Sequence, residues 1–117
     1  MASEDLSALR TKSATHLRTI GAALMGFYVN HGRAARGFDE LIEWLGSPAL
    51  FESPLPGVRY VRTPQVFAEC GPDRILAFEE GATELVNVLW GDGRVETLPA
   101  EDAARLIKAS GGAAGEA

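Results

Sequence analysis

The feature that most constrains this fold is one helical pattern over about residues 3–31. Apolar residues recur there at spacings of three, four and seven, the period of a helix that packs one side on a core. Ser3 is placed as an N-cap, and Gly32 follows the last periodic residue. Gly21 and Gly26 within the pattern indicate that something packs closely against the helix. The expected helix-packing residues are Leu17, Ile20, Leu24 and Phe27.

Strand-like runs follow the helices at regular spacing. They lie at about residues 58–63, 74–79, 85–90 and 94–98. No connection after Val58 is long enough for a helical crossover, so an antiparallel meander is the economical topology. The clearest turn is Gly91-Asp92-Gly93, for which we expect a tight hairpin of type I′.

Two shorter helices are expected on either side of these strands. The first covers residues 37–46, with Asp39 or a neighbour as its cap and Gly46 at its end. The second has Pro99 at its first helical position and runs to about Ala109.

Between the second helix and the first strand, prolines interrupt the chain. Three of them fall in residues 47–56, which predicts an irregular connection with one short extended piece at 49–51.

The elements together predict one α+β domain over residues 1–109. A long N-terminal helix packs on a three- to four-stranded antiparallel sheet, with short second and C-terminal helices. Residues 110–117 form a glycine- and alanine-rich tail that we expect to be disordered. The expected core is Leu17, Ile20, Leu24, Phe27, Leu41, Trp44, Tyr60, Leu76, Phe78, Val88, Trp90, Val95, Leu106 and Ile107.

Charge is unevenly distributed along the chain. The net charge of −5 argues against nucleic-acid binding, which normally needs a basic surface. Residues 1–36 carry five basic and two acidic side chains, and the remainder carries six and fourteen. A basic helix and an acidic body can neutralise each other within one molecule, or dock head to tail between subunits.

Residues that could carry chemistry are few, and we expect no enzymatic activity, no catalytic residue and no cofactor. His16 and His31 lie about 22 Å apart on one helix and cannot share a metal. Cys70 is the only cysteine and is flanked by acids, so an inert thiol is expected. No metal site is predicted; weak calcium candidates with oxygen ligands are Glu84, Asn87 and Asp92.

Two stretches of the chain are similar to bacterial prepilin-type (pseudopilin) proteins, a family abundant in planctomycetes. Residues 13–24 (SATHLRTIGAAL), followed by Tyr28 and His31-Gly32, resemble the family's helix segment, Asn-Leu-Lys-Gln-Ile-Gly-Leu-Ala-Leu. Residues 87–95 (NVLWGDGRV) resemble its closing hairpin, Asn-Val-Leu-Phe-x-Asp-Gly-x-Val, in which Asn87, Asp92 and Gly93 are the motif and turn residues. Where some members place a His before this Asp-Gly, the chain has Ala82, and no hydrophobic half-helix precedes residue 13.

The resemblance implies a structural or assembly role in a type II secretion or type IV pilus-related system, through protein partners or self-association. The alternative is a free-standing regulatory domain that binds a protein or peptide at the sheet edge or beside Trp44 and Trp90. A small-molecule pocket between helix and sheet is a third, weaker option; nucleic acid, a membrane segment and a small-molecule substrate are not expected. A truncated pilin-like protein would belong to the periplasm or cell envelope, and a true start at Met1 would place the domain in the cytoplasm.

Overall fold

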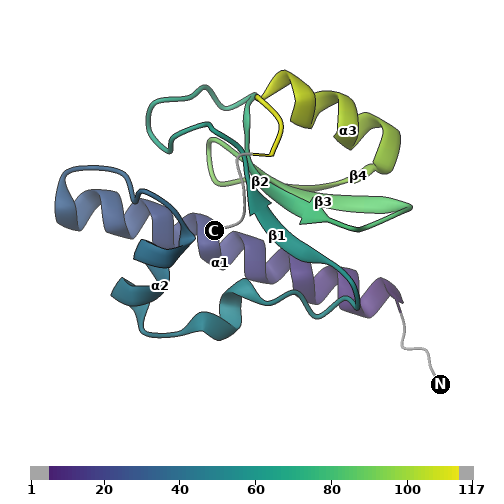
Figure 1. The fold of residues 1–117 in the computed structure, drawn as a ribbon, viewed down its shortest axis with the longest axis horizontal. Coiled ribbons are helices and arrows are strands. Elements are labelled where there is room, and N and C mark those ends of the chain that lie inside the picture. Colours follow the sequence, from purple (N-terminus) through teal and green to yellow (C-terminus); the bar gives the residue numbers. More distant parts are fainter. Residues whose placement is uncertain (1–5, 114–117) are drawn as a thin grey trace.

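The computed structural model of the chain describes residues 6–113. Its elements are α1 (Leu6–His31), α2 (Phe38–Leu45), the 3₁₀ helix η1 (Pro48–Phe51), β1 (Arg59–Arg62), β2 (Ile75–Glu80), β3 (Leu85–Trp90), β4 (Val95–Pro99) and α3 (Ala100–Ala109). Helices α1 and α3 cover opposite faces of the sheet, and α2 lies beside the C-terminal half of α1 (Figure 1). The predicted α+β class and its long N-terminal helix are confirmed.

The sheet is the predicted meander, with four strands in the order β1-β2-β3-β4 and every pair antiparallel. Its last hairpin differs from the predicted type I′ turn. Gly93 N–H donates to the Trp90 carbonyl at 2.9 Å, and Trp90 N–H donates to the Arg94 carbonyl at 2.8 Å. Gly93 has a positive φ of 90°, whereas Gly91 and Asp92 do not. The loop is therefore a three-residue connection closed by a left-handed glycine.

Two apolar clusters fill the spaces on either side of the sheet, because alternate strand residues point to opposite faces. The α1-side cluster consists of Leu17, Ile20, Phe27, Phe38, Leu41, Tyr60, Leu76, Ala77 and Leu89. The α3-side cluster consists of Val61, Ile75, Phe78, Val86, Val88, Trp90 and Ala103.

Most of the predicted core is confirmed, with five exceptions. Leu24, Val95, Leu106 and Ile107 are only half-buried. Trp44 is 39% exposed, because its ring lies on the α1 surface over Gly26, where an added Cβ would stand 3.2 Å from it. Gly21 likewise lets α1 approach β3, since a Cβ there would be 3.0 Å from Leu89 Cδ1. The two glycines thus mark close contacts, as predicted.

Several predicted element ends are corrected by the structure. The N-cap of α2 is Gly37, without a side-chain cap bond, and Asp39 lies in the first turn, where its charge favours the helix end. Helix α3 begins at Ala100, directly after Pro99. Residues 49–51 belong to a 3₁₀ helix that starts at Pro48, instead of an extended piece. The Ser3 cap lies outside the described residues.

The segment after α3 is attached to the sheet through Ser110. This residue is 1% exposed, and its Oγ accepts the Ile75 N–H at 2.8 Å. Its carbonyl accepts a bond from Gln65 Nε2 at 2.8 Å. The expectation of a disordered tail is therefore wrong at its first residue, Ser110, which is buried; residues 114–117 lie outside the described part.

Candidate functional site

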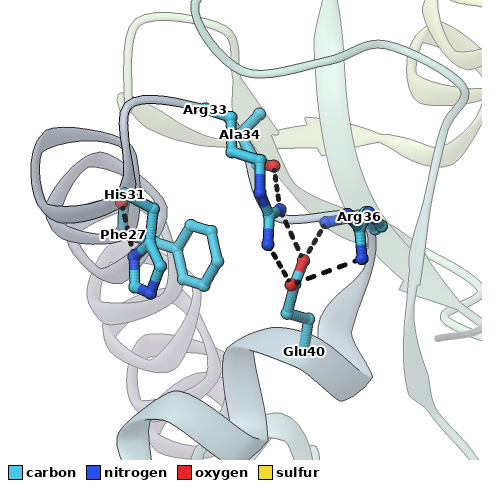
Figure 2. A network of polar contacts seen from close by, with 6 residues as sticks. All are labelled: Phe27, His31, Arg33, Ala34, Arg36 and Glu40. Carbon is cyan, nitrogen blue, oxygen red and sulfur yellow. Dashed lines mark hydrogen bonds and ion pairs between the residues drawn. The ribbon is translucent and has the colours of Figure 1, made fainter.

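A charged cluster occupies the loop that joins α1 to α2 (Figure 2). Arg33 donates from Nη1 and Nη2 to the two carboxylate oxygens of Glu40, at 3.0 and 2.6 Å. The Arg36 backbone N–H donates to Glu40 Oε1 at 2.7 Å, and its Nη1 lies 3.9 Å from Oε2. One carboxylate therefore holds two arginines and closes the loop.

This cluster shifts the ionisation of its members. The hydrogen bonds from Arg33 and from the Arg36 backbone lower the pKa of Glu40 to about 2. The bond to Glu40 in turn raises the pKa of Arg33. Glu40 therefore stays ionised throughout the range in which most proteins remain folded.

We expect Glu40→Gln to lower the melting temperature at neutral pH and to lose most of this effect in acid. The folded pKa of Glu40 is about 2 against an ordinary 4.5, so its stabilisation is present above pH 4.5 and is lost as pH falls through 2. Melting curves of parent and variant from pH 7 to pH 2 measure the difference. Glu43→Gln makes the same charge change at an exposed position of α2. An equal effect of the two variants at pH 7 would contradict the prediction.

An aromatic cluster fixes α2 against the end of α1. The rings of Phe27 and His31 stack with centroids 3.9 Å apart, and the Trp44 ring stands edge-on to both, at 5.5 and 5.8 Å. The Arg33 guanidinium lies 5.2 Å from the Phe27 centroid, which orients it toward Glu40. His31 therefore ends the helix in a packing role.

A pocket of about 300 Å³ opens beside this charged cluster. Its wall is mainly apolar and includes Leu24, Phe38, Phe67, Leu76 and Ala77. Its charged lining residues are Arg33, Arg36, Arg62 and Glu69. These residues come from α1, the 33–38 loop, the first two strands and the 65–69 segment, so only the tertiary fold brings them together. We call this cavity the arginine pocket.

Arg62, the last residue of β1, differs from the other two arginines. In the described part of the chain it makes no hydrogen bond or ion pair, and its Nε is buried without a partner. The Gly37 backbone lies over it, since a Cβ at Gly37 would be 3.5 Å from Arg62 Nε. An unmade hydrogen bond of this kind is costly, and an acceptor bound to the guanidinium would remove that cost.

The outward side of α1 carries a row of exposed residues, Arg18, Ala22, Met25 and Val29, which we call the outer stripe. Their spacing of four, three and four places them along one side of the helix, away from the buried Leu17 and Ile20. Met25 is 52% and Val29 74% exposed.

A polar ladder crosses the sheet beneath the N-terminal half of α1. Tyr60, Glu79, Asn87 and Thr97 are successive partners on the four strands. The Glu79 carboxylate accepts the Asn87 backbone N–H at 2.9 Å and its side-chain Nδ2 at 3.0 Å. It also accepts a hydrogen bond from Ser13 of α1. Thr97 donates to Asn87 Oδ1.

Tyr60 completes this network from the first strand. Its hydroxyl lies 2.8 Å from Ser13 Oγ, and since Ser13 donates to Glu79, Tyr60 is the donor. Burial raises the pKa of Tyr60 to about 12, which keeps this donor protonated. Glu79 is 2% exposed. The network thus satisfies a buried carboxylate and ties α1 to the sheet.

The weak calcium candidates are not brought together by the fold. Asn87 is buried, whereas Glu84 and Asp92 lie beyond opposite ends of β3. Glu84 instead pairs with Arg10 at 3.4 Å, and Asp92 Oδ1 accepts the Arg94 backbone N–H at 3.0 Å. Within residues 6–113 no group of three or more His, Cys, Asp or Glu side chains could hold a metal ion.

The other singled-out residues are dispersed. His16 is half-buried, with its ring 6.5 Å from that of Tyr60. Burial raises the pKa of the Cys70 thiol, which makes the reactive thiolate scarce. Trp90 is buried on the α3 side and donates from Nε1 to Glu96 at 2.9 Å. In the described part of the chain, no helix is both long and apolar enough to span a bilayer.

Sequence reasoning missed the polar ladder and the arginine pocket. The ladder left a signal, because counting outward from the hairpin centre at Asp92 places Asn87 opposite Thr97. Glu79 falls at the end of the predicted strand 74–79, where a charged side chain gives no sign of burial. The arginine pocket left no comparable pattern in the sequence, because Arg62 and the 33–38 loop are brought together only by tertiary packing.

No match to this chain was found among protein-family models, curated proteins or solved structures.

Proposed function

We propose that this domain is a non-enzymatic, pilin-like structural or assembly module, related to those of type II secretion or type IV pilus systems. The observation that carries the proposal is the outer stripe of α1, a long helix packed on the sheet by one side only. The resemblance of residues 13–32 and 87–95 to pseudopilins supports the same role. Ser13 donates a hydrogen bond to Glu79, and both residues are buried. Their burial supports a structural role for this serine and carboxylate over a catalytic one.

The partner that fits the outer stripe best is α2 of a second copy. Met25 and Val29 offer apolar surface next to Arg18, which forms no ion pair in the described residues. On α2 the acidic Asp39 and Glu43 are exposed, and Leu45 and the part of Trp44 that does not pack on α1 add apolar surface. Apolar surface meets apolar surface, and a basic group meets acidic ones.

Such a contact uses different surfaces on the two copies. A heterologous contact of this kind leaves one free surface at each end of a dimer, so it builds open assemblies. Of the five basic residues in the first 36, Arg10, Arg33 and Arg36 are already paired within the molecule, with Glu84 and Glu40. The head-to-tail contact therefore relies on Arg18, because Lys12, six residues earlier on α1, does not belong to the outer stripe.

We expect salt-sensitive self-association in sedimentation velocity over a concentration series, weakened at least tenfold by Arg18→Glu. Reversing the partner charge as well, with Glu43→Arg, should restore association between the two charge-swapped surfaces. Lys108→Glu is the control, because Lys108 is exposed on α3, on the opposite face of the sheet. A strict monomer at every salt concentration would overturn this assembly mode.

A second candidate function is a free-standing protein- or peptide-binding regulatory domain. The arginine pocket favours it, because an apolar cavity with a few convergent polar groups is the usual form of a recognition site. Pull-down of a defined partner by the monomeric Arg18→Glu variant would support this function over assembly.

A further inference from the structure

We propose that the arginine pocket binds a small apolar acid, with its carboxylate on Arg62 and its apolar body against Leu24, Phe38 and Phe67. This inference goes beyond the assembly role and uses none of the outer stripe residues. It is carried by the pocket's wall, by its charge and by the unpartnered Arg62 Nε.

The size and wall of the cavity define the body of the ligand. Its volume is about 300 Å³, and a cavity of about 150 Å³ accommodates one benzene ring. Two fused rings or a medium-length alkyl chain therefore match the space. The wall residues Leu24, Phe38, Phe67, Leu76 and Ala77 provide no hydrogen-bonding side chain, so this part of the ligand must be apolar.

The charged lining defines the head group. Even with Glu40 counted beside the lining acid Glu69, the three arginines leave the pocket with a positive balance of one charge. Arg33 and Arg36 are held in place by Glu40, so their positions are set before a ligand arrives. Arg62 is the arginine with a buried N–H left to donate, and a guanidinium matches a carboxylate through two parallel bonds.

The surroundings of Arg62 favour a carboxylate over a phosphate. A second, shallower hollow next to the pocket is lined by the three acids Asp39, Glu40 and Glu43 and by only two arginines, Arg36 and Arg62. None of these acids forms an ion pair with Arg62, but their side chains line the same hollow as its guanidinium side chain. Like-charge repulsion therefore penalises a dianion more than a monoanion.

The test measures binding of 2-naphthoate and decanoate by calorimetry, with 2-naphthamide and 1-decanol as neutral counterparts. These two acids distinguish an aromatic from an alkyl ligand. At least one acid is expected to bind with a Kd below about 1 mM and at least tenfold more tightly than its neutral counterpart. Inorganic phosphate should not compete.

The matched variants are Arg62→Gln and Arg74→Gln. Arg74 is exposed and does not line the pocket. Arg62→Gln should weaken binding of the acid at least tenfold and leave its neutral counterpart unchanged, whereas Arg74→Gln should change neither. Amide resonances of Gly37, Gln65 and Phe67 should shift on titration with the acid, which locates the ligand.

All measurements use the full chain carrying Arg18→Glu, so failure of binding and failure of self-association are distinguishable. Thermal melting of Arg62→Gln establishes that it is folded. Equal affinity for acid and neutral compound, equal affinity of Arg62→Gln, or no saturable binding of either acid would each overturn the proposal.

Discussion

Ile20→Asp is expected to unfold the domain. The Ile20 side chain is fully buried in the α1-side cluster, facing the sheet. An aspartate there loses the packing of the isoleucine, about 2–5 kcal/mol, and leaves a buried carboxylate without a partner, which costs several kcal/mol more. Since small domains have only about 5–15 kcal/mol of stability, the loss exceeds what this one can tolerate. Circular dichroism and urea titration measure it.

Leu24→Asp is the control for this prediction. Leu24 lies one turn further along the same side of α1 but is half-buried and lines the arginine pocket. Water and the neighbouring arginines can therefore solvate and pair the new carboxylate. We expect this variant to remain folded with a reduced melting temperature. If Ile20→Asp melts within a few degrees of the parent, α1 does not pack on the sheet as described.

Asn87→Asp is the second substitution with a large expected effect. The Asn87 Nδ2 donates to Glu79 Oε2 at 3.0 Å and to the Arg10 carbonyl at 3.1 Å. Aspartate has nearly the same shape, but it removes both donors and places a second carboxylate against Glu79 in a buried site. Breaking a buried charged network in this way typically costs about 3–5 kcal/mol.

The expected pH dependence separates this mechanism from simple loss of packing. One proton bound between two adjacent carboxylates removes their repulsion. The difference in unfolding free energy between parent and Asn87→Asp should therefore be smaller at pH 5 than at pH 7.5. Asn30→Asp makes the same change at an exposed position of α1 and should cost less than about 1 kcal/mol at both values. A cost at Asn87 that does not vary with pH would contradict the repulsion.

Local errors in the sequence-based prediction have specific causes. A type I′ turn was expected at Gly91-Asp92-Gly93 because the dipeptide Asp-Gly suits it, but a three-residue loop with Gly93 left-handed also closes the hairpin. Trp44 is expected in the core as part of the inward side of the helix at residues 37–46, but the structure lays it on the surface of α1 over Gly26. In both cases two local solutions fit the sequence, and non-local packing selected one.

The arginine pocket could not be predicted in the same way as the fold. Its positive groups come from residues 33–36 and from Arg62, which have no common periodicity or motif. Counting charges along the chain also hid the pocket, because the basic N-terminal third includes Arg33 and Arg36, which both pair with the single carboxylate of Glu40. Which arginine remains unpaired depends on distances between side chains.

The sequence by itself determined the elements and their order. The helical spacing of the apolar residues determined α1, and connections too short for a helical crossover determined the antiparallel sheet. Both follow from backbone geometry over neighbouring residues. Only the tertiary structure decided how Tyr60, Glu79, Asn87 and Thr97 align, and that Arg62 lies beneath Gly37 with its Nε unpaired. Those features arise from contacts between residues far apart in the chain, and such contacts are set by the packing of whole elements.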